Sequence, residues 1–330
     1  MATLHPGHLH FFRDSLHNDH ALPGFGAAFA SHRCCPCRQA GTERAAGCTE
    51  TTIGLATKMR APEFHKSQVL QALREAHQSG VAADASGVRD DIDVLAVLQH
   101  AAAAGGWRPG SAPAYWKSGG PSPALPLFHA PLPTQGVLPS HSERNPARIG
   151  QPACTLYGVE AEIALRIGRR VDRALALTLT ADSVHGLVDA MTVAIEWVDS
   201  RWRQNLQAPL PLLQADRLSH GALVLGQDWL PYLPRDWSAQ RCTVQIDAEA
   251  VREFKGSHPL GDPSAVLLPW LLHATEHWGS VEAGSVVTTG SWTGILQARA
   301  GSRVGVSFDG LAQAWLEFGA GSSAPPFCNE

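Results

Sequence analysis

The segment 159–167 constrains the fold more than any other part of the sequence, because its apolar residues alternate with Glu160, Glu162, Ala164 and Arg166. A period of two predicts a β-strand with two unlike faces. Both glutamates then point to one side, about 7 Å apart along the backbone, where their carboxylates can reach a single cation. The alternative is an exposed strand whose polar face is merely solvated.

A third acid, Glu196, lies in the segment 193–198, which is otherwise apolar enough to be buried. Buried carboxylates are usually paired or bound to metal, so the alternatives are a metal site or an ion pair of Glu196 or Asp199 with Arg201. Of the two acids, Glu196 is the preferred third ligand. Carboxylate oxygens favour Mg²⁺, Mn²⁺ or Ca²⁺ over Zn²⁺.

Lys117 follows two aromatic residues and precedes a glycine turn, within the segment 115–120. Such a turn can hold the ammonium group in a partly dry pocket, where desolvation lowers the pKa of a lysine and makes it a usable base. The alternative is a solvated surface lysine.

The remaining patterns predict an α+β fold, since helices come first and many irregularly spaced strands follow. Helices are predicted over 67–79, 90–104, 184–191 and 263–278, and loops with short strands over 109–152. Strands are predicted over 159–167, 192–198, 222–225, 242–248, 285–289, 303–308 and 312–318. We expect a disordered leader over 1–58, a helical and loop portion carrying Lys117 over 59–150, and a metal-binding domain over 151–330.

Charge and composition argue against several classes of partner. The net charge is -4 and the basic residues are scattered, which gives no electrostatic footprint for nucleic acid or an anionic membrane. No apolar run approaches the roughly 20 residues that cross a bilayer, and the N-terminus lacks a secretory pattern, so a cytoplasmic location is expected. A cluster near the N-terminus could bind zinc, although a non-structural leader is the favoured interpretation: Cys34, Cys35, Cys37 and Cys48.

The chain resembles the fumarylacetoacetate hydrolase superfamily, and within it the branch of 2-keto-4-pentenoate hydratases, 2-oxo-hept-3-ene-1,7-dioate hydratases and 4-oxalocrotonate decarboxylases. The resemblance covers about residues 66–318. It implies a mixed β-roll with a small N-terminal α/β portion, usually in homo-oligomers. By position it implies metal binding by Glu160, Glu162 and Glu196 and an active-site role for Lys117. The matching parts occur in the family's order: Lys117 and the segments 158–164, 194–201, 256–263 and 286–291.

Residues 215–221 are similar to a family stretch that usually reads Asp-Asn-Ala-Ser-Ser-Gly. The resemblance implies that Asp216 and Ser219 bind substrate. Here Arg217 and His220 stand where the family has small polar residues, so the resemblance does not fix which 2-oxo acid is the substrate.

Two further segments bear on the site. Residues 116–119 depart from the usual Trp-Lys-Ile-Gly, and residues 52–55 imitate that motif without its lysine, which we interpret as coincidence. Thr289 and Ser291 could orient a substrate carboxylate through hydroxyl and backbone N–H donors, or could simply flank a turn at Gly290.

The resemblance and the carboxylates together favour a hydratase that adds water to a 2-hydroxydienoate after its ketonisation to a 2-oxo-enoate. Mg²⁺ or Mn²⁺ would be the cofactor and Lys117 the general acid and base, in the catabolism of aromatic compounds. Three alternatives stay open. They are decarboxylation of a 2-oxo diacid, hydrolysis of an acylpyruvate with His129 or His141 as base, and a catalytically idle member that uses the fold for binding.

Overall fold

The computed structural model describes residues 61–150, 156–233 and 235–319. The predictions for the leader, the cysteine cluster and residues 52–55 lie outside these ranges. Within them no helix is both long enough and apolar enough to cross a membrane. The helices are α1 (Ala61–Ser79), α2 (Val94–Ala104), α3 (Arg173–Ala176), α4 (Leu210–Ala215) and α5 (Leu267–His277).

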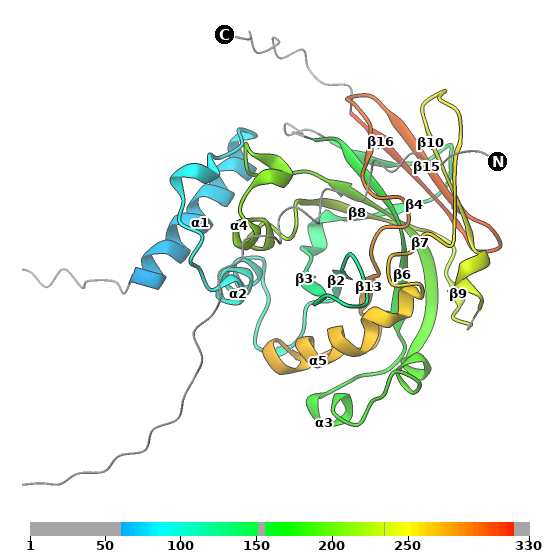
Figure 1. Cartoon of the computed structure of the whole chain (residues 1–330), viewed down its shortest axis with the longest axis horizontal. Coiled ribbons are helices and arrows are strands. Elements are labelled where there is room, and N and C mark those ends of the chain that lie inside the picture. Colours follow the sequence, from blue (N-terminus) through cyan, green and yellow to red (C-terminus); the bar gives the residue numbers. More distant parts are fainter. Residues whose placement is uncertain (1–60, 151–155, 234, 320–330) are drawn as a thin grey trace, which may run out of the picture. The chain divides into compact units, whose positions relative to one another are not determined.

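The largest sheet has nine strands and carries most of the site (Figure 1). Its main path runs β3 (Phe128–Pro131), β2 (Tyr115–Gly119), β13 (Val286–Thr288), β6 (Gly158–Ile167), β7 (Val188–Val198), β8 (His220–Gly226) and β4 (Val137–Ser140). Two short strands extend it, β14 (Leu296–Gln297) beside β6 and β9 (Leu230–Pro231) beside β7. The β2–β13 and β4–β8 pairs are parallel, whereas β6, β7 and β8 are antiparallel neighbours.

A second sheet of five strands packs against the first, with contacts from β15 and β16 to β7. Its order is β11 (Arg252–Lys255), β10 (Arg241–Ile246), β15 (Arg303–Phe308), β16 (Gln313–Phe318) and β5 (Ala147–Ile149). A two-stranded parallel sheet joins β1 (Gly110–Ser111) to β12 (Gly279–Ser280). Strands from both sides of residue 150 thus share the two larger sheets.

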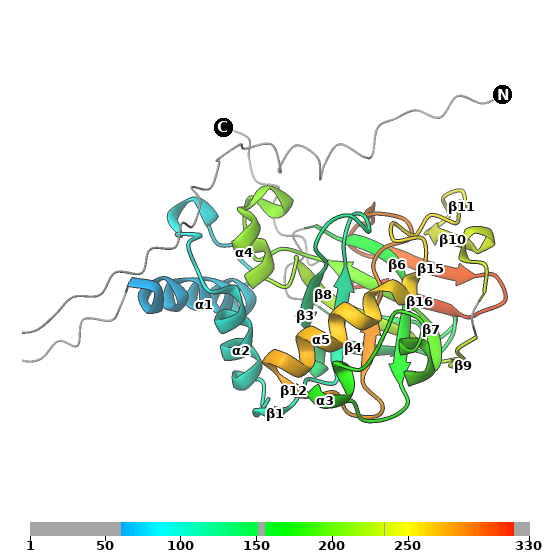
Figure 2. The same cartoon turned by 60° about the horizontal axis from the view of Figure 1, so that its bottom comes forward.

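The main hydrophobic core includes residues of both sheets and of α5, whereas buried residues of α1 and α4 belong to a second cluster with Trp202. Trp116 on β2 packs against Trp270 and Trp278, which lie on and just after α5, at ring distances of 6.2 and 5.4 Å. Helix α5 and the residue after it therefore pack against the strand that carries Lys117, and Figure 2 shows the helix crossing in front of the large sheet. Curled sheets with flanking helices confirm the predicted α+β fold.

Most predicted elements are found within a few residues of their expected bounds, but the helix predicted over 184–191 is wrong. Only Val184–Leu187 forms one 3-10 turn, and β7 begins at Val188. The reason is tertiary, because pairing with β6 continues back to Val188 and extends the strand through residues that an isolated sequence allows to be helical.

The first turn of the predicted helix 263–278 is also a 3-10 turn, Pro263–Val266, and the α-helix starts at Leu267. The N–H of Ala265 donates to the carbonyl of Asp262 and the N–H of Leu267 donates to that of Ser264, the spacing of a 3-10 turn. Asp262 caps the segment as expected, because its carboxylate accepts a hydrogen bond from the N–H of Ser264.

Candidate metal centre

Strands β6 and β7 bring three carboxylates to one face of the large sheet. Glu160 lies directly opposite Glu196 in the register, and Glu162 lies two residues further along β6 on the same side. One oxygen from each acid can be chosen so that all three lie within 4.8 Å of one another. The solvated-face alternative does not fit Glu162, which is only 2% exposed, whereas Glu160 is half-buried.

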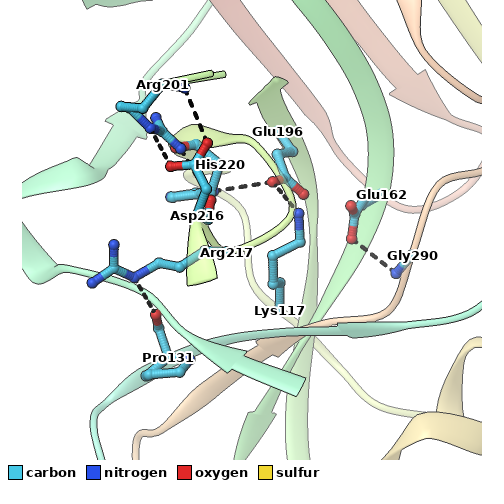
Figure 3. A network of polar contacts seen from close by, with 9 residues as sticks. All are labelled: Lys117, Pro131, Glu162, Glu196, Arg201, Asp216, Arg217, His220 and Gly290. Atoms are coloured by element: carbon cyan, nitrogen blue, oxygen red, sulfur yellow. Dashed lines mark hydrogen bonds and ion pairs between the residues drawn. The ribbon is translucent and has the colours of Figure 1, made fainter. Parts of the chain in front are cut away.

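Lys117 on β2 completes this cluster from the neighbouring part of the sheet. Its Nζ lies 2.5 Å from Oε1 of Glu196, and its side chain is 12% exposed. The parallel β2–β13 pair and the antiparallel β13–β6 pair place Lys117 two strands away from Glu160 and Glu162. Figure 3 shows the ammonium group pointing at Glu196, with Glu162 facing the same space.

His220, at the start of β8, holds Glu196 from the other side. Its Nδ1 lies 3.0 Å from the same Oε1 atom that Lys117 contacts, so Oε2 of Glu196 is used by neither. Because a carboxylate only accepts, Nδ1 carries the proton. Burial lowers the pKa of His220 to about 4 despite this bond, which keeps the ring neutral near pH 7.

The electrostatics of the cluster are those of a cation site. Burial, followed by the charge of Glu196, raises the pKa of Glu160 to about 7, and the same effects raise the pKa of Glu162 well above its ordinary value. Burial also acts to raise the pKa of Glu196, but the charge of Lys117 and the bond from His220 lower it to about 2. One ammonium group thus balances only one of the three carboxylates, of which Glu162 and Glu196 are buried and Glu160 is half-buried.

A divalent cation fits this donor set. It would supply the two missing positive charges, and three carboxylate oxygens suit Mg²⁺, Mn²⁺ or Ca²⁺. In the ranges that the structure describes, no other group of three such side chains meets the same distance limit.

The expectation that burial lowers the pKa of Lys117 is wrong for the cluster as it stands. Burial acts in that direction, but the charges of Glu196 and Glu160 outweigh it and raise the pKa above the ordinary value. Lys117 is therefore protonated, and can act as a proton donor, while no cation balances the charge of the three acids.

The loop after β13 supports the acids through its backbone. The N–H of Gly290 donates to Oε2 of Glu162 at 2.9 Å, and the φ of 95° at this residue favours glycine. The hydroxyl of Thr289 is already used, since it donates to the carbonyl of Ile163 at 2.9 Å. Ser291 forms a hydrogen bond that lowers the pKa of Glu160. The loop thus holds β6, and substrate contacts by Thr289 and Ser291 stay a prediction.

Asp216 and Ser219 lie close to the cluster but differ in their surroundings. Asp216 is paired with the guanidinium group of Arg201, whose Nη1 also donates to the carbonyl of His220 at 2.6 Å. The alternative to a metal site paired Arg201 with Glu196 or Asp199, whereas here the guanidinium group forms its ion pair with Asp216. The hydroxyl of Ser219 is fully buried and finds no hydrogen-bond partner among the described residues, which is compatible with a ligand or water there.

The two histidines considered as a hydrolytic base are engaged elsewhere. Nδ1 of His129 lies 2.8 Å from the hydroxyl of Ser118, and Nδ1 of His141 lies 3.3 Å from Oε1 of Gln227 in an exposed region. No hydrogen bond joins either of them to the acids within the described ranges.

Sequence reasoning missed two supports of the acids. His220 was noted only as a departure from the family, and the Gly290 amide only as part of a turn. A histidine opening an apolar strand and a glycine between two hydroxyl residues are the only local signals, and neither indicates which acid is contacted without the register.

Comparisons with known proteins identify the family and the fold of this chain. The sequence profile of the fumarylacetoacetate (FAA) hydrolase C-terminal family matches residues 98–316. A 4-oxalocrotonate decarboxylase from a Pseudomonas species is 29% identical over 146 residues, which are 44% of this chain and 54% of the relative. The match thus spans about half the length of that relative.

Two solved structures share the fold, both of 4-oxalocrotonate decarboxylase from Pseudomonas putida G7. The complex with magnesium and adipate has a TM-score of 0.64, and the complex with calcium and acetate has a TM-score of 0.62. Each is 16% identical and covers 79% of this chain and 100% of the solved chain. With a profile match across two thirds of its length and three clustered acids, this chain belongs to the fumarylacetoacetate hydrolase family.

Proposed function

We propose that this chain is a divalent-cation-dependent lyase that adds water to a 2-hydroxydienoate, a small 2-oxo acid in its enol form. The observation that carries the proposal is the group of three acids within 4.8 Å of one another, beside a lysine whose Nζ is 2.5 Å from one of them. Glu160, Glu162 and Glu196 would hold Mg²⁺ or Mn²⁺. When bound, the cation would act as a Lewis acid on the 2-oxo group and stabilise the enolate charge.

Lys117 would move the protons of the reaction. Its pKa is raised by the charge of the acids, so neutralising the acids leaves burial as the main effect, and burial lowers it. The same group can then donate and recover a proton near neutral pH. It would protonate the far carbon (C5) of the dienol while the enol proton leaves to solvent, which gives the 2-oxo-enoate. As the water oxygen bonds to C4, Lys117 would recover its proton from that water, and C3 would take up a proton from solvent as the enolate returns to the 2-oxo form.

His220 and Gly290 would act on the acids and not on the substrate. The imidazole N–H orients one oxygen of Glu196, and the backbone N–H orients one oxygen of Glu162. Groups that hold ligand carboxylates in this way preserve the geometry of a metal site. Asp216, Ser219, Thr289 and Ser291 are proposed as the surroundings of the substrate, with the unpaired hydroxyl of Ser219 as a candidate contact.

Decarboxylation of a 2-oxo diacid is the second candidate, because it would use the same enolate. The likeness to proteins named 4-oxalocrotonate decarboxylase, in a relative and in solved structures, favours it. Hydrolysis of an acylpyruvate is less favoured, since both candidate histidines bond to other groups.

The test is the loss of ultraviolet absorbance from freshly generated 2-hydroxypenta-2,4-dienoate with Mg²⁺, with Mn²⁺ and with EDTA. We expect metal-dependent decay to 4-hydroxy-2-oxopentanoate that is lost in Glu162→Gln and Lys117→Met. Glu253→Gln is the matched control, because this strand glutamate is exposed and pairs with Arg241. Release of carbon dioxide from a 2-oxo diacid with no hydration would move the assignment to decarboxylase. If neither substrate reacts, the chain would be assigned as a catalytically idle member of the family.

A further inference from the structure

The turn between α4 and β8 has an unusual backbone. Three consecutive residues that are not glycine, Arg217, Leu218 and Ser219, have φ of 53°, 53° and 60°. This left-handed region is unfavourable for residues with a Cβ atom, and runs of it persist only where the surroundings enforce them. Here the N–H of Leu218 donates to Leu213 and the N–H of Asp199 donates to Ser219, both at 2.7 Å. The turn therefore fixes the direction in which Arg217 leaves the backbone.

The guanidinium group of Arg217 is held but not paired with an acid. Its Nε donates to the carbonyl of Pro131 at 3.0 Å, and the side chain is partly buried. Within the described ranges no carboxylate forms an ion pair with it, since the neighbouring Asp216 is taken by Arg201. Burial, followed by the charge of Arg201, lowers the pKa of Arg217 to about 10.

The two terminal amino groups of Arg217 have room for a ligand. Among the described residues, neither amino group donates a hydrogen bond. Neither belongs to the polar atoms that are completely buried without a partner, either. They therefore face accessible space. A guanidinium presents its terminal N–H groups in a planar fork that matches a carboxylate, and a desolvated cation next to a second cation gains most from an anion.

The position of Arg217 relative to the acids suits a molecule with two charged ends. Pro131 follows Ala130, which is the cross-strand partner of Lys117, so the Nε contact lies about one strand spacing, roughly 5 Å, from the lysine backbone. In Figure 3 the guanidinium group points away from Glu196 toward Pro131. It is turned away from the acids and is free to meet the other end of a ligand anchored beside them.

We propose that Arg217 forms a second anion site that binds the distal carboxylate of a 2-oxo diacid. The proposal rests on the proposed function, in which the 2-oxo end binds at the three acids, and it predicts that a chain with a second, distal carboxylate binds more tightly than a monoacid. A charge-assisted hydrogen-bonded pair predicts a preference of about ten- to hundredfold for a diacid over the matching monoacid.

The test uses isothermal titration of the full-length protein with Mg²⁺ present and two saturated ligands, 2-oxohexanedioate and 2-oxohexanoate. They have the same chain length and differ only in the distal carboxylate. We expect wild type to bind the diacid about ten- to hundredfold more tightly, and Arg217→Gln to bring the ratio close to one by weakening the diacid alone. Arg203→Gln is the matched control, because this exposed arginine pairs with Asp84.

The outcomes separate the two proposals. Equal Mg²⁺-dependent binding of both ligands to wild type, or a ratio that Arg217→Gln leaves unchanged, overturns the second anion site while the proposed function stands. Mg²⁺-independent binding, or none, overturns both. Thermal unfolding checks whether Arg217→Gln folds. If it does not, the ratio of the two Kd values for wild type still tests the second anion site.

Discussion

Replacing Glu160 by glutamine should stabilise the protein when no metal is bound. The pKa of Glu160 rises from 4.5 to about 7 in the folded chain. The unfolded chain therefore loses this proton near pH 4.5, whereas the folded chain keeps it until about pH 7. Below both values the residue has no effect on stability. Above both, ionisation costs the folded state up to about 3 kcal/mol, at 1.36 kcal/mol for each unit of pKa.

Glutamine has the same shape and cannot ionise, so Glu160→Gln removes this cost. Urea unfolding in EDTA at about pH 8 should show the variant more stable by up to about 3 kcal/mol, and most of the advantage should be gone at about pH 5. Excess Mg²⁺, at about a hundred times its Kd, should stabilise wild type by about 3 kcal/mol and the variant by less, which closes or reverses the difference.

Glu253→Gln serves as the control here too, since that exposed acid should give no such pH-dependent gain. A Glu160→Gln protein that is less stable than wild type at about pH 8 in EDTA would refute the reasoning. So would an advantage of the same size at about pH 5.

Three other changes test the packing and charge of the site. Lys117→Met removes the cation beside Glu196 and should destabilise the metal-free protein by about 3 to 5 kcal/mol in urea unfolding; a loss that excess Mg²⁺ does not reduce at all would contradict this. Gly221→Ala would place a Cβ 2.6 Å from the ring and 2.9 Å from the carbonyl oxygen of Trp197, so the free energy of unfolding should fall by about 1 to 3 kcal/mol. Gly186→Ala is the control, because its Cβ would meet nothing within 4 Å and should leave Tm unchanged. His220→Asn should raise the Kd for Mg²⁺ about tenfold or more, measured by the dependence of Tm on Mg²⁺, and an unchanged Kd would show that the imidazole does not position the acid.

Local pattern was sufficient to predict the strands that carry the acids. The alternation over 159–167 is visible in the sequence because each face of β6 has its own composition, and Glu196 stands out as a charge within an apolar run. The resemblance to the family, confirmed by the profile match, added Lys117, whose own neighbourhood is equally typical of a surface residue.

What the sequence did not reveal depends on contacts between distant segments. The bond from His220 to Glu196 requires the pairing of β7 with β8, and the ion pair of Asp216 with Arg201 requires the turn that follows α4. The raised pKa of Lys117 depends on how many acids surround the ammonium group in the folded chain. Neither burial nor spacing along the sequence reveals that number.

The parallel pairing of β2 with β13 has a consequence for how the protein is made. It places Lys117 beside Thr288, so the strand carrying the lysine pairs with β13 only when residues 286–288, far away along the sequence, are available. Contacts between such distant residues are slow to form, because a long loop must close before they can contribute. During synthesis the acids of β6 and β7 emerge well before β13, and they must wait, exposed to water, for the strand that connects them to the lysine. The cluster should therefore form only after β13 has been synthesised, and chaperone dependence should increase when β13 is weakened.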